Sequence, residues 1–171
     1  MDQTMDESVS IRVARPEDEA ALTELITASY ATLDDGRYDS RQLAKALVPM
    51  SKANPKLLGS DTYFVAEVNG IAGACGGWSF EKPGTTEIEE GVAHIRHFAT
   101  HPNYLRRGLA RQLIERCLNE ARERGVRLIK VQSTLHAERF YASAGFRSVG
   151  PIDVTIGPGI MLPAVGMELY F

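Results

Sequence analysis

The chain has 171 residues, of which 44% are hydrophobic and 24% are charged, and its formal net charge at pH 7 is −3. This length favours a single domain over residues 1–171 with a sizeable core, and the composition is that of an ordinary soluble globular protein. No apolar run approaches the roughly 20 residues of a membrane span, the acidic N-terminus is unlike a secretory or transit signal, and the net charge argues against a general nucleic-acid binder.

The first half of the chain predicts a strand, two helices and a loop. Residues 1–8 are expected to be flexible, and SIRVA at 10–14 alternates polar and apolar side chains, as a strand does. Pro16 suits the first turn of a helix that ends near residue 33. A second helix is expected from Ser40 to about Met50, followed by a loop over residues 52–61.

A hairpin and a bulged strand come next. TYFVAEV at 62–68 and IAGACGGWSF at 71–80 flank Asn69-Gly70, which supplies the two positive-φ residues of a tight hairpin turn. An acidic loop then leads to a strand over Val92–Thr100. The apolar positions of this strand change phase partway along, and a bulge near Arg96-His97 would reconcile them.

The second half predicts two helices and three strands. A helical stripe begins at Gly108 and ends before Gly125, and a strand follows at 126–133. HAERFYASAG at 136–145 is a short helix. Two closing strands at 146–157 and 163–171 surround the turn-rich PGIMLP. This order predicts one mixed α/β sheet with helices on both faces.

Charge and cysteine are distributed unevenly along the chain. Residues 1–40 hold ten acidic and three basic side chains, whereas residues 106–127 hold seven Arg and three Glu. The basic run fits either a solvated helix face or a local anion site. Cys75 and Cys117 lie far apart without metal-type spacing, which favours a reduced, cytoplasmic chain with two buried thiols.

The basic turn before the predicted helix has the physical features of an anion site. The first N–H groups of a helix lack intrahelical partners, and the helix dipole adds partial positive charge there. Gly108 would let a ligand approach the backbone closely, and Arg106, Arg107 and Arg111 would add charge attraction. A plain helix cap is the alternative that these residues alone leave open.

Two stretches carry a resemblance to a known family. IRHFATHPNYLRRGLA at 95–110 is similar to the motif Arg/Gln-x-x-Gly-x-Gly/Ala of the GCN5-related N-acetyltransferases, with Gly108 and Ala110 at the two small positions. RFYASAGF at 139–146 resembles a second family pattern near the last helix. The chain departs from the family at Leu105, where Arg or Gln is usual, and at Thr100, where Val is usual.

The resemblance implies a fold, a reaction and site residues. It implies a mostly antiparallel sheet of about seven strands and the transfer of acetyl from acetyl-CoA to a primary amine by direct attack. The backbone of Phe98 and Thr100 would pair with the pantetheine arm, and Tyr141 would be the general acid that protonates the leaving thiolate. The pyrophosphate would be held by the turn and helix start, comprising Leu105, Arg106, Arg107, Gly108, Leu109, Ala110 and Arg111.

Other roles remain open at this stage. His94 is the first candidate for a general base, with His97 behind it, and bulk water could also take the proton. Arg96 would either meet an acidic group on the acceptor or pair with Glu89 or Glu90. Core packing is the preferred interpretation of Trp78 and Phe80. No metal site is expected, because no Cys or carboxylate spacing completes a zinc set with the three histidines at 94, 97 and 101.

The acceptor is expected to be a small-molecule or peptide amine, and the protein could be a homodimer. Four alternatives compete with this interpretation: transfer of a longer acyl chain, transfer to a protein amine, an acyl-CoA-binding domain without catalysis, and a structural α/β domain whose basic turn is only a cap.

Overall fold

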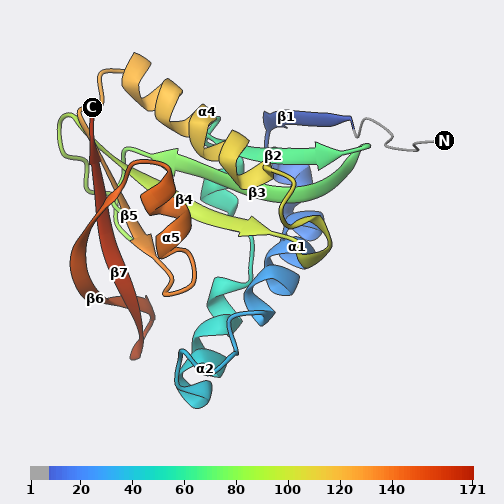
Figure 1. Cartoon of the computed structure of the whole chain (residues 1–171), viewed down its shortest axis with the longest axis vertical. Coiled ribbons are helices and arrows are strands. Elements are labelled where there is room, and N and C mark those ends of the chain that lie inside the picture. Colours follow the sequence, from blue (N-terminus) through green and yellow to red (C-terminus); the bar gives the residue numbers. More distant parts are fainter. Residues whose placement is uncertain (1–7) are drawn as a thin grey trace.

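A seven-stranded sheet with the strand order β1-β2-β3-β4-β5-β7-β6 forms the centre of the computed structural model, which describes residues 8–171 (Figure 1). All neighbouring strands pair antiparallel except β4 and β5, which pair parallel. The prediction of a mixed, mostly antiparallel sheet is therefore confirmed. The strands are β1 (Val9–Val13), β2 (Tyr63–Val68), β3 (Ile71–Ser79), β4 (Val92–Thr100), β5 (Leu128–Ser133), β6 (Arg147–Gly157) and β7 (Ile160–Tyr170).

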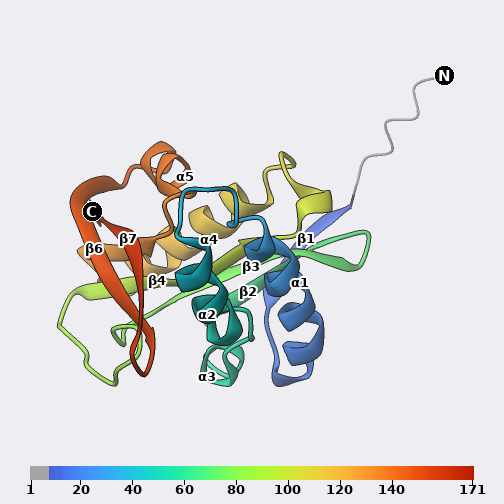
Figure 2. The same cartoon turned by 90° about the horizontal axis from the view of Figure 1, so that it is seen from below.

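Helices cover both faces of this sheet, as Figure 2 shows. A core cluster that includes Leu113, Ile114 and Tyr141 packs α4 and α5 against one face. A second cluster, which includes Leu22 and Leu43, packs α1 and α2 against the other face. The helices are α1 (Glu19–Ala31), α2 (Ser40–Met50), α3 (Pro55–Leu58), α4 (Leu109–Glu123) and α5 (Glu138–Ser143), with short 3-10 turns at Pro16–Asp18 and Pro102–Tyr104.

Two segments differ from the sequence prediction. The expected loop at 52–61 contains α3, because the Asn54 side chain accepts a hydrogen bond from the Lys56 N–H and caps the helix. The predicted turn at 158–163 is shorter, and β7 already begins at Ile160. Pro163 is tolerated there because β7 extends past the end of β5 and has β6 as its one neighbour. The predicted flexibility of residues 1–8 falls, apart from Ser8, outside the described residues.

Strand β4 has two irregularities that shape the molecule. Its parallel pairing with β5 covers only three residue pairs, of which the last is His94 with Lys130, and beyond this point the strands separate. On the other side, its register with β3 shifts between the pairs Gly77–Arg96 and Cys75–Ala99, and His97 has a φ of 52°. The predicted bulge near Arg96-His97 is thus confirmed.

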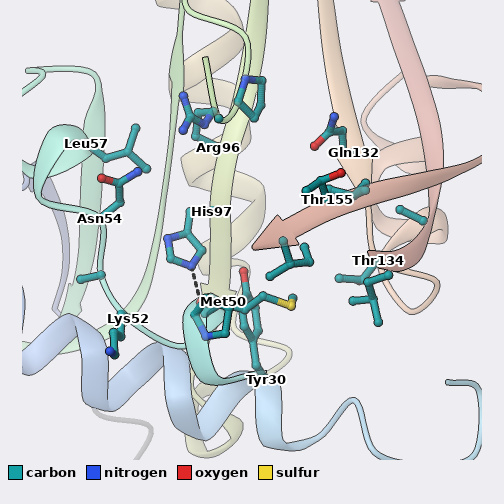
Figure 3. A pocket seen from close by; sticks show the side chains of 18 of the residues that line it. Tyr30, Met50, Lys52, Asn54, Leu57, Arg96, His97, Gln132, Thr134 and Thr155 are labelled. Atoms are coloured by element: carbon teal, nitrogen blue, oxygen red, sulfur yellow. Dashed lines mark hydrogen bonds between the residues drawn. The ribbon is translucent and has the colours of Figure 1, made fainter. Parts of the chain in front are cut away.

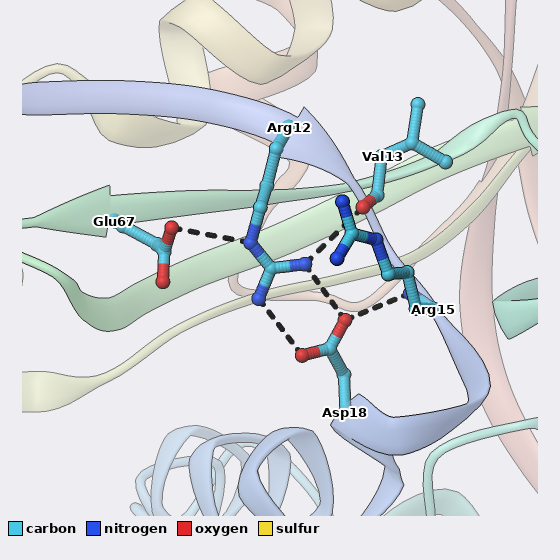
Figure 4. Close-up of polar contacts among 5 residues, drawn as sticks. All are labelled: Arg12, Val13, Arg15, Asp18 and Glu67. Atoms are coloured by element: carbon cyan, nitrogen blue, oxygen red, sulfur yellow. Dashed lines mark hydrogen bonds and ion pairs between the residues drawn. The ribbon is translucent and has the colours of Figure 1, made fainter.

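An ion-pair cluster around Arg12 fixes the start of the first helical segment to the sheet (Figure 4). The Arg12 guanidinium donates two hydrogen bonds of 2.8 Å to the Asp18 carboxylate and one of 3.1 Å to Glu67 on β2. Asp18 also accepts from the backbone N–H of Arg15 at 2.7 Å. The hydrogen bond from Arg12 lowers the pKa of Asp18 below its ordinary value.

We expect Arg12→Gln to lower the free energy of unfolding at pH 7 by about 2 kcal/mol, since paired charge-assisted hydrogen bonds are lost. Because the folded-state pKa of Asp18 is lowered, this stabilisation is complete above the ordinary carboxyl pKa of about 4 and is lost progressively as pH falls from there through the folded-state pKa. Urea denaturation at pH 7 and pH 3 measures both values. An equal loss at the two pH values would assign the effect to packing of the Arg12 stem.

The exposed pair of Arg37 and Asp35, with 3.7 Å between nitrogen and oxygen, provides a control. Arg37→Gln removes the same charge, and we expect it to leave the free energy of unfolding unchanged within error.

Candidate active site

A cavity of about 380 Å³ opens where β4 and β5 separate. We call it the inter-strand cavity. Its walls come from α1, the outer half of β4, the turn before α4 with the start of that helix, β5 and α5. Five of the predicted site residues lie on these walls: Phe98, Thr100, Leu105, Ala110 and Tyr141. Residues that are up to 43 positions apart in the sequence, from Phe98 to Tyr141, therefore share one space.

The start of α4 lies at one end of this cavity. Gly108 is the residue before the helix and has a φ of 75°, and Arg106 has a φ of 61°. No side chain caps the helix, and the first intrahelical bond runs from the Gln112 N–H to the Gly108 carbonyl. The backbone N–H groups that precede Gln112 in the first turn are therefore left to bind something else.

The arginine side chains around this turn do not all point to solvent. Arg111 donates to the carbonyl and the hydroxyl of Ser143, at 3.2 and 2.7 Å, and so ties α4 to α5. The Arg107 guanidinium donates to the Asn103 carbonyl at 3.4 Å and lies 5.1 Å from the centre of the Tyr104 ring. Part of the donor capacity of the Arg111 guanidinium is therefore used to join the two helices.

Two buried tyrosines hold the bulge of β4 in place. The Tyr63 hydroxyl donates to the His97 carbonyl at 2.6 Å, and the Tyr30 hydroxyl donates to the Phe98 carbonyl at 3.1 Å. Burial raises the pKa of both phenols, so they remain protonated donors. Sequence reasoning missed both residues, although Tyr30 lies four positions after the buried Ile26 and shares its helix face.

A larger cavity of about 950 Å³ lies beside the first one and is shown from close by in Figure 3. We call it the wide cavity. Its walls are β4, the segment from α2 to α3, the end of β5 and the β6–β7 hairpin. Four residues line both cavities, so the two spaces meet between β4 and β5. These residues are Tyr30, His97, Gln132 and Thr134.

His97 presents a neutral imidazole at this junction. Its Nε2 lies 2.8 Å from the Met50 carbonyl oxygen, and because a carbonyl can only accept, Nε2 carries the hydrogen (Figure 3). Burial lowers the pKa of His97, and the nearby Arg96 lowers it further. In the neutral ring the lone pair is then on Nδ1, which is the atom able to accept a proton.

His94 lies away from this junction. It lines a third cavity of about 560 Å³, together with Lys82 and Lys130, and it lines neither of the other two. Burial, followed by the charges of Lys130, Arg96 and Lys82, lowers the pKa of His94 to about 4. The bulge explains the difference between the two histidines, because it turns His97 toward the junction.

Tyr141 projects from α5 into a group of aromatic rings. Its ring centre lies 6.2 Å from that of Phe98, 5.1 Å from that of Phe140 and 5.6 Å from that of Phe146. Within residues 8–171, no group forms a hydrogen bond with its hydroxyl. Burial raises the pKa of Tyr141, so the hydroxyl keeps its proton at neutral pH and can donate it to a group in the inter-strand cavity.

Trp78, Phe80 and the two cysteines lie in the interior of the protein or pack against it. Trp78 is fully buried, and its indole N–H donates to Glu120 on α4 at 3.3 Å, so its assignment to core packing is confirmed. Phe80 packs edge-on against Trp78 with 5.0 Å between ring centres. Cys75 and Cys117 are free and buried, and burial raises the pKa of Cys75 to about 12, so both thiols are protonated.

Among residues 8–171, no three His, Cys, Asp or Glu side chains are grouped as metal ligands would be. No helix in the same range has the length and apolarity needed to cross a membrane.

Several solved structures share the fold of this chain. A GCN5-related N-acetyltransferase from Rhodopseudomonas palustris matches with a TM-score of 0.77 and 22% identity, covering 98% of this chain and 99% of the other. The PaiA N-acetyltransferase of Thermoplasma acidophilum, solved with coenzyme A, matches with a TM-score of 0.70 and 15% identity over 96% and 99% of the two chains. YncA of Salmonella typhimurium, solved with its cofactor acetyl-CoA, matches with a TM-score of 0.61 and 23% identity over 95% and 94% of the two chains.

The sequence itself carries the family assignment. The model of the acetyltransferase (GNAT) family matches residues 21–146, and this chain belongs to that family of N-acetyltransferases. A comparison with the curated proteins gave no match.

Proposed function

We propose that this protein transfers acetyl from acetyl-CoA to a primary amine by direct attack, with the thioester in the inter-strand cavity and the amine in the wide cavity. The observation that carries the proposal is the junction of the two cavities at Tyr30, His97, Gln132 and Thr134. It offers one place where two substrates can meet from opposite sides of the split sheet.

The start of α4 is the proposed site of the acetyl-CoA pyrophosphate. The unbonded N–H groups at Leu109, Ala110 and Arg111 suit an anion, and Gly108 leaves room beside the backbone. The complexes of PaiA with coenzyme A and of YncA with acetyl-CoA support this ligand for a related fold. Leu105 offers its backbone alone, and Arg106 adds positive charge.

The edge of β4 that faces away from β3 is the proposed site of the pantetheine arm. Beyond His94 this edge has no pairing with β5, so an extended ligand can take the place of a neighbouring strand. The Thr100 N–H donates to the Ser29 hydroxyl at 3.3 Å, a long bond that a pantetheine carbonyl would replace. The Phe98 carbonyl already accepts from Tyr30 and keeps a second lone pair.

The reaction requires one bond to form and one to break. The amine nitrogen attacks the thioester carbon, the new C–N bond forms, and the C–S bond breaks to release a thiolate. His97 Nδ1 receives the proton that the amine loses, and the Tyr141 hydroxyl donates to the departing sulfur. His97 is preferred to His94 as the base, because His94 lines neither cavity of the junction.

The test is an assay of coenzyme A thiol release from acetyl-CoA with a panel of small amines and peptides, beside calorimetric titration with acetyl-CoA. We expect binding of acetyl-CoA and thiol release that depends on the amine. Binding of acetyl-CoA without thiol release in the presence of any amine would favour the non-catalytic acyl-CoA-binding alternative. A folded protein that does not bind acetyl-CoA would overturn the proposal. Longer acyl-CoA thioesters in the same assay test the alternative of a longer acyl chain.

A further inference from the structure

One of the charged side chains that line the wide cavity, that of Arg96, is half-buried. Four formally charged residues line the cavity, and three of them, Glu19, Lys52 and Asp153, are exposed at its rim. Arg96 is half-buried and comes from β4 itself, beside the junction (Figure 3). The deeper part of the cavity near the junction is therefore positively charged.

Within residues 8–171, the Arg96 guanidinium forms no ion pair. Its one hydrogen bond among these residues runs from Nη1 to the Ser79 hydroxyl at 2.9 Å, and Ser79 donates in turn to the Glu81 backbone carbonyl at 2.7 Å. The sequence suggested a pair with Glu89 or Glu90, but in the described part of the chain no carboxylate lies within 4.0 Å of the Arg96 nitrogens. The charge of Glu81 raises the pKa of Arg96, but burial lowers it by more.

This arrangement leaves most of the binding capacity of Arg96 available. A guanidinium has five N–H donors in a rigid fork, and a single one is used here. A partly buried charge without a counterion costs free energy. For this reason burial lowers the pKa of Arg96. A carboxylate brought by a ligand would satisfy both the charge and the unused donors.

The bulge of β4 also places Arg96 next to the proposed base. In a regular strand, consecutive side chains point to opposite faces of the sheet. Here the positive φ of His97 turns its side chain to the same cavity as Arg96, whereas Phe98 packs against Phe140 and Tyr141 on the other side. A proton acceptor and a cation are thus neighbours on one wall.

We infer that the acceptor is a primary amine that carries a carboxylate close to the amino group, and that Arg96 binds this carboxylate while His97 faces the amine. The inference rests on the proposed acetyl transfer and adds the chemical class of the acceptor. The carboxylate could come from a free amino acid or from an acidic first residue of a peptide. The chemistry recognised by Arg96 is the same in both.

The experiment compares acceptors that differ only in this charge. Free amino acids are paired with their amides, and peptides that begin with Asp or Glu are paired with peptides that begin with Asn or Gln. We expect kcat/KM of the parent to favour the carboxylate member of at least one kind of pair by about 10- to 100-fold. The kind of pair that shows this preference identifies the source of the carboxylate.

Variants of two cavity residues complete the design. Arg96→Gln should reduce the preference to within about threefold while acetyl-CoA affinity is unchanged, and Arg96→Lys, which keeps the charge without the fork, should retain part of it. Lys52→Gln removes a rim charge from the same cavity and should leave the preference intact.

The outcomes separate this inference from the function on which it rests. If the parent transfers acetyl to amides and carboxylates equally well, the inference is overturned while the proposed function stands. If the parent binds acetyl-CoA but none of the acceptors causes thiol release, the proposed function fails and the inference fails with it. A preference that survives in folded Arg96→Gln would assign carboxylate recognition to another residue and overturn the role of Arg96.

Discussion

Gly108→Trp should abolish calorimetric binding of acetyl-CoA, with a loss in affinity of at least about 100-fold. The residue stands at the start of α4, where the unbonded N–H groups are proposed to hold the pyrophosphate. A Cβ built on Gly108 meets no protein atom within 4 Å, so the indole would occupy the space kept for the ligand rather than disrupt the core. Titration of parent and variant with acetyl-CoA measures the difference.

The opposite end of the same helix supplies a matched control. Gly125 also has a positive φ, of 83°, and open space where a Cβ would be, so Gly125→Trp imposes a similar backbone strain of about 1 kcal/mol. We expect this variant to bind acetyl-CoA as the parent does. Equal losses in the two variants would attribute the effect to strain in α4 and remove the turn as the binding site.

Tyr141→Phe should lower kcat by about 100-fold at neutral pH, within the range that a positioned proton donor contributes. The hydroxyl has no hydrogen-bond partner within residues 8–171, and the ring contacts with Phe98, Phe140 and Phe146 remain in the variant. Stability and acetyl-CoA affinity should therefore change little. Steady-state kinetics of thiol release with the best acceptor of the panel, beside thermal melting, measures these quantities.

Tyr104→Phe is the control for this second prediction. It removes a phenol hydroxyl shortly before the glycine turn that precedes α4, and Tyr104 lines neither cavity of the junction. We therefore expect kcat of this variant to stay within about twofold of the parent. If Tyr141→Phe also keeps the parental kcat, water rather than Tyr141 supplies the proton to the leaving thiolate.

Much of the fold could be predicted because periodicity reports which face of an element is buried. The two apolar runs that became β2 and β3, the Asn69-Gly70 turn between them and the stripe of α4 each correspond to an observed element. The change of phase in β4 revealed the bulge, since an extra residue must shift the alternation. The turn before α4 could be predicted from Gly108, because a positive φ at that position favours glycine.

The remaining features depend on contacts between distant segments. No local pattern indicates that the Tyr63 hydroxyl reaches the His97 carbonyl, or that Arg111 is bound to Ser143 on α5. The choice between His94 and His97 depended on which residue of the bulge takes the positive φ, and this is decided by packing against Tyr30 and Met50. Sequence reasoning therefore identified the strand and preferred His94, whereas the proposed function assigns the base to His97.

The short parallel pairing of β4 with β5 divides the sheet into two parts, β1–β4 and β5–β7, whose direct contact within the sheet is three residue pairs. Each part contributes to the junction: His97 belongs to one, and Gln132 to the other. The proposed reaction centre therefore takes its side chains from both parts, and a substrate bound there would contact both at once.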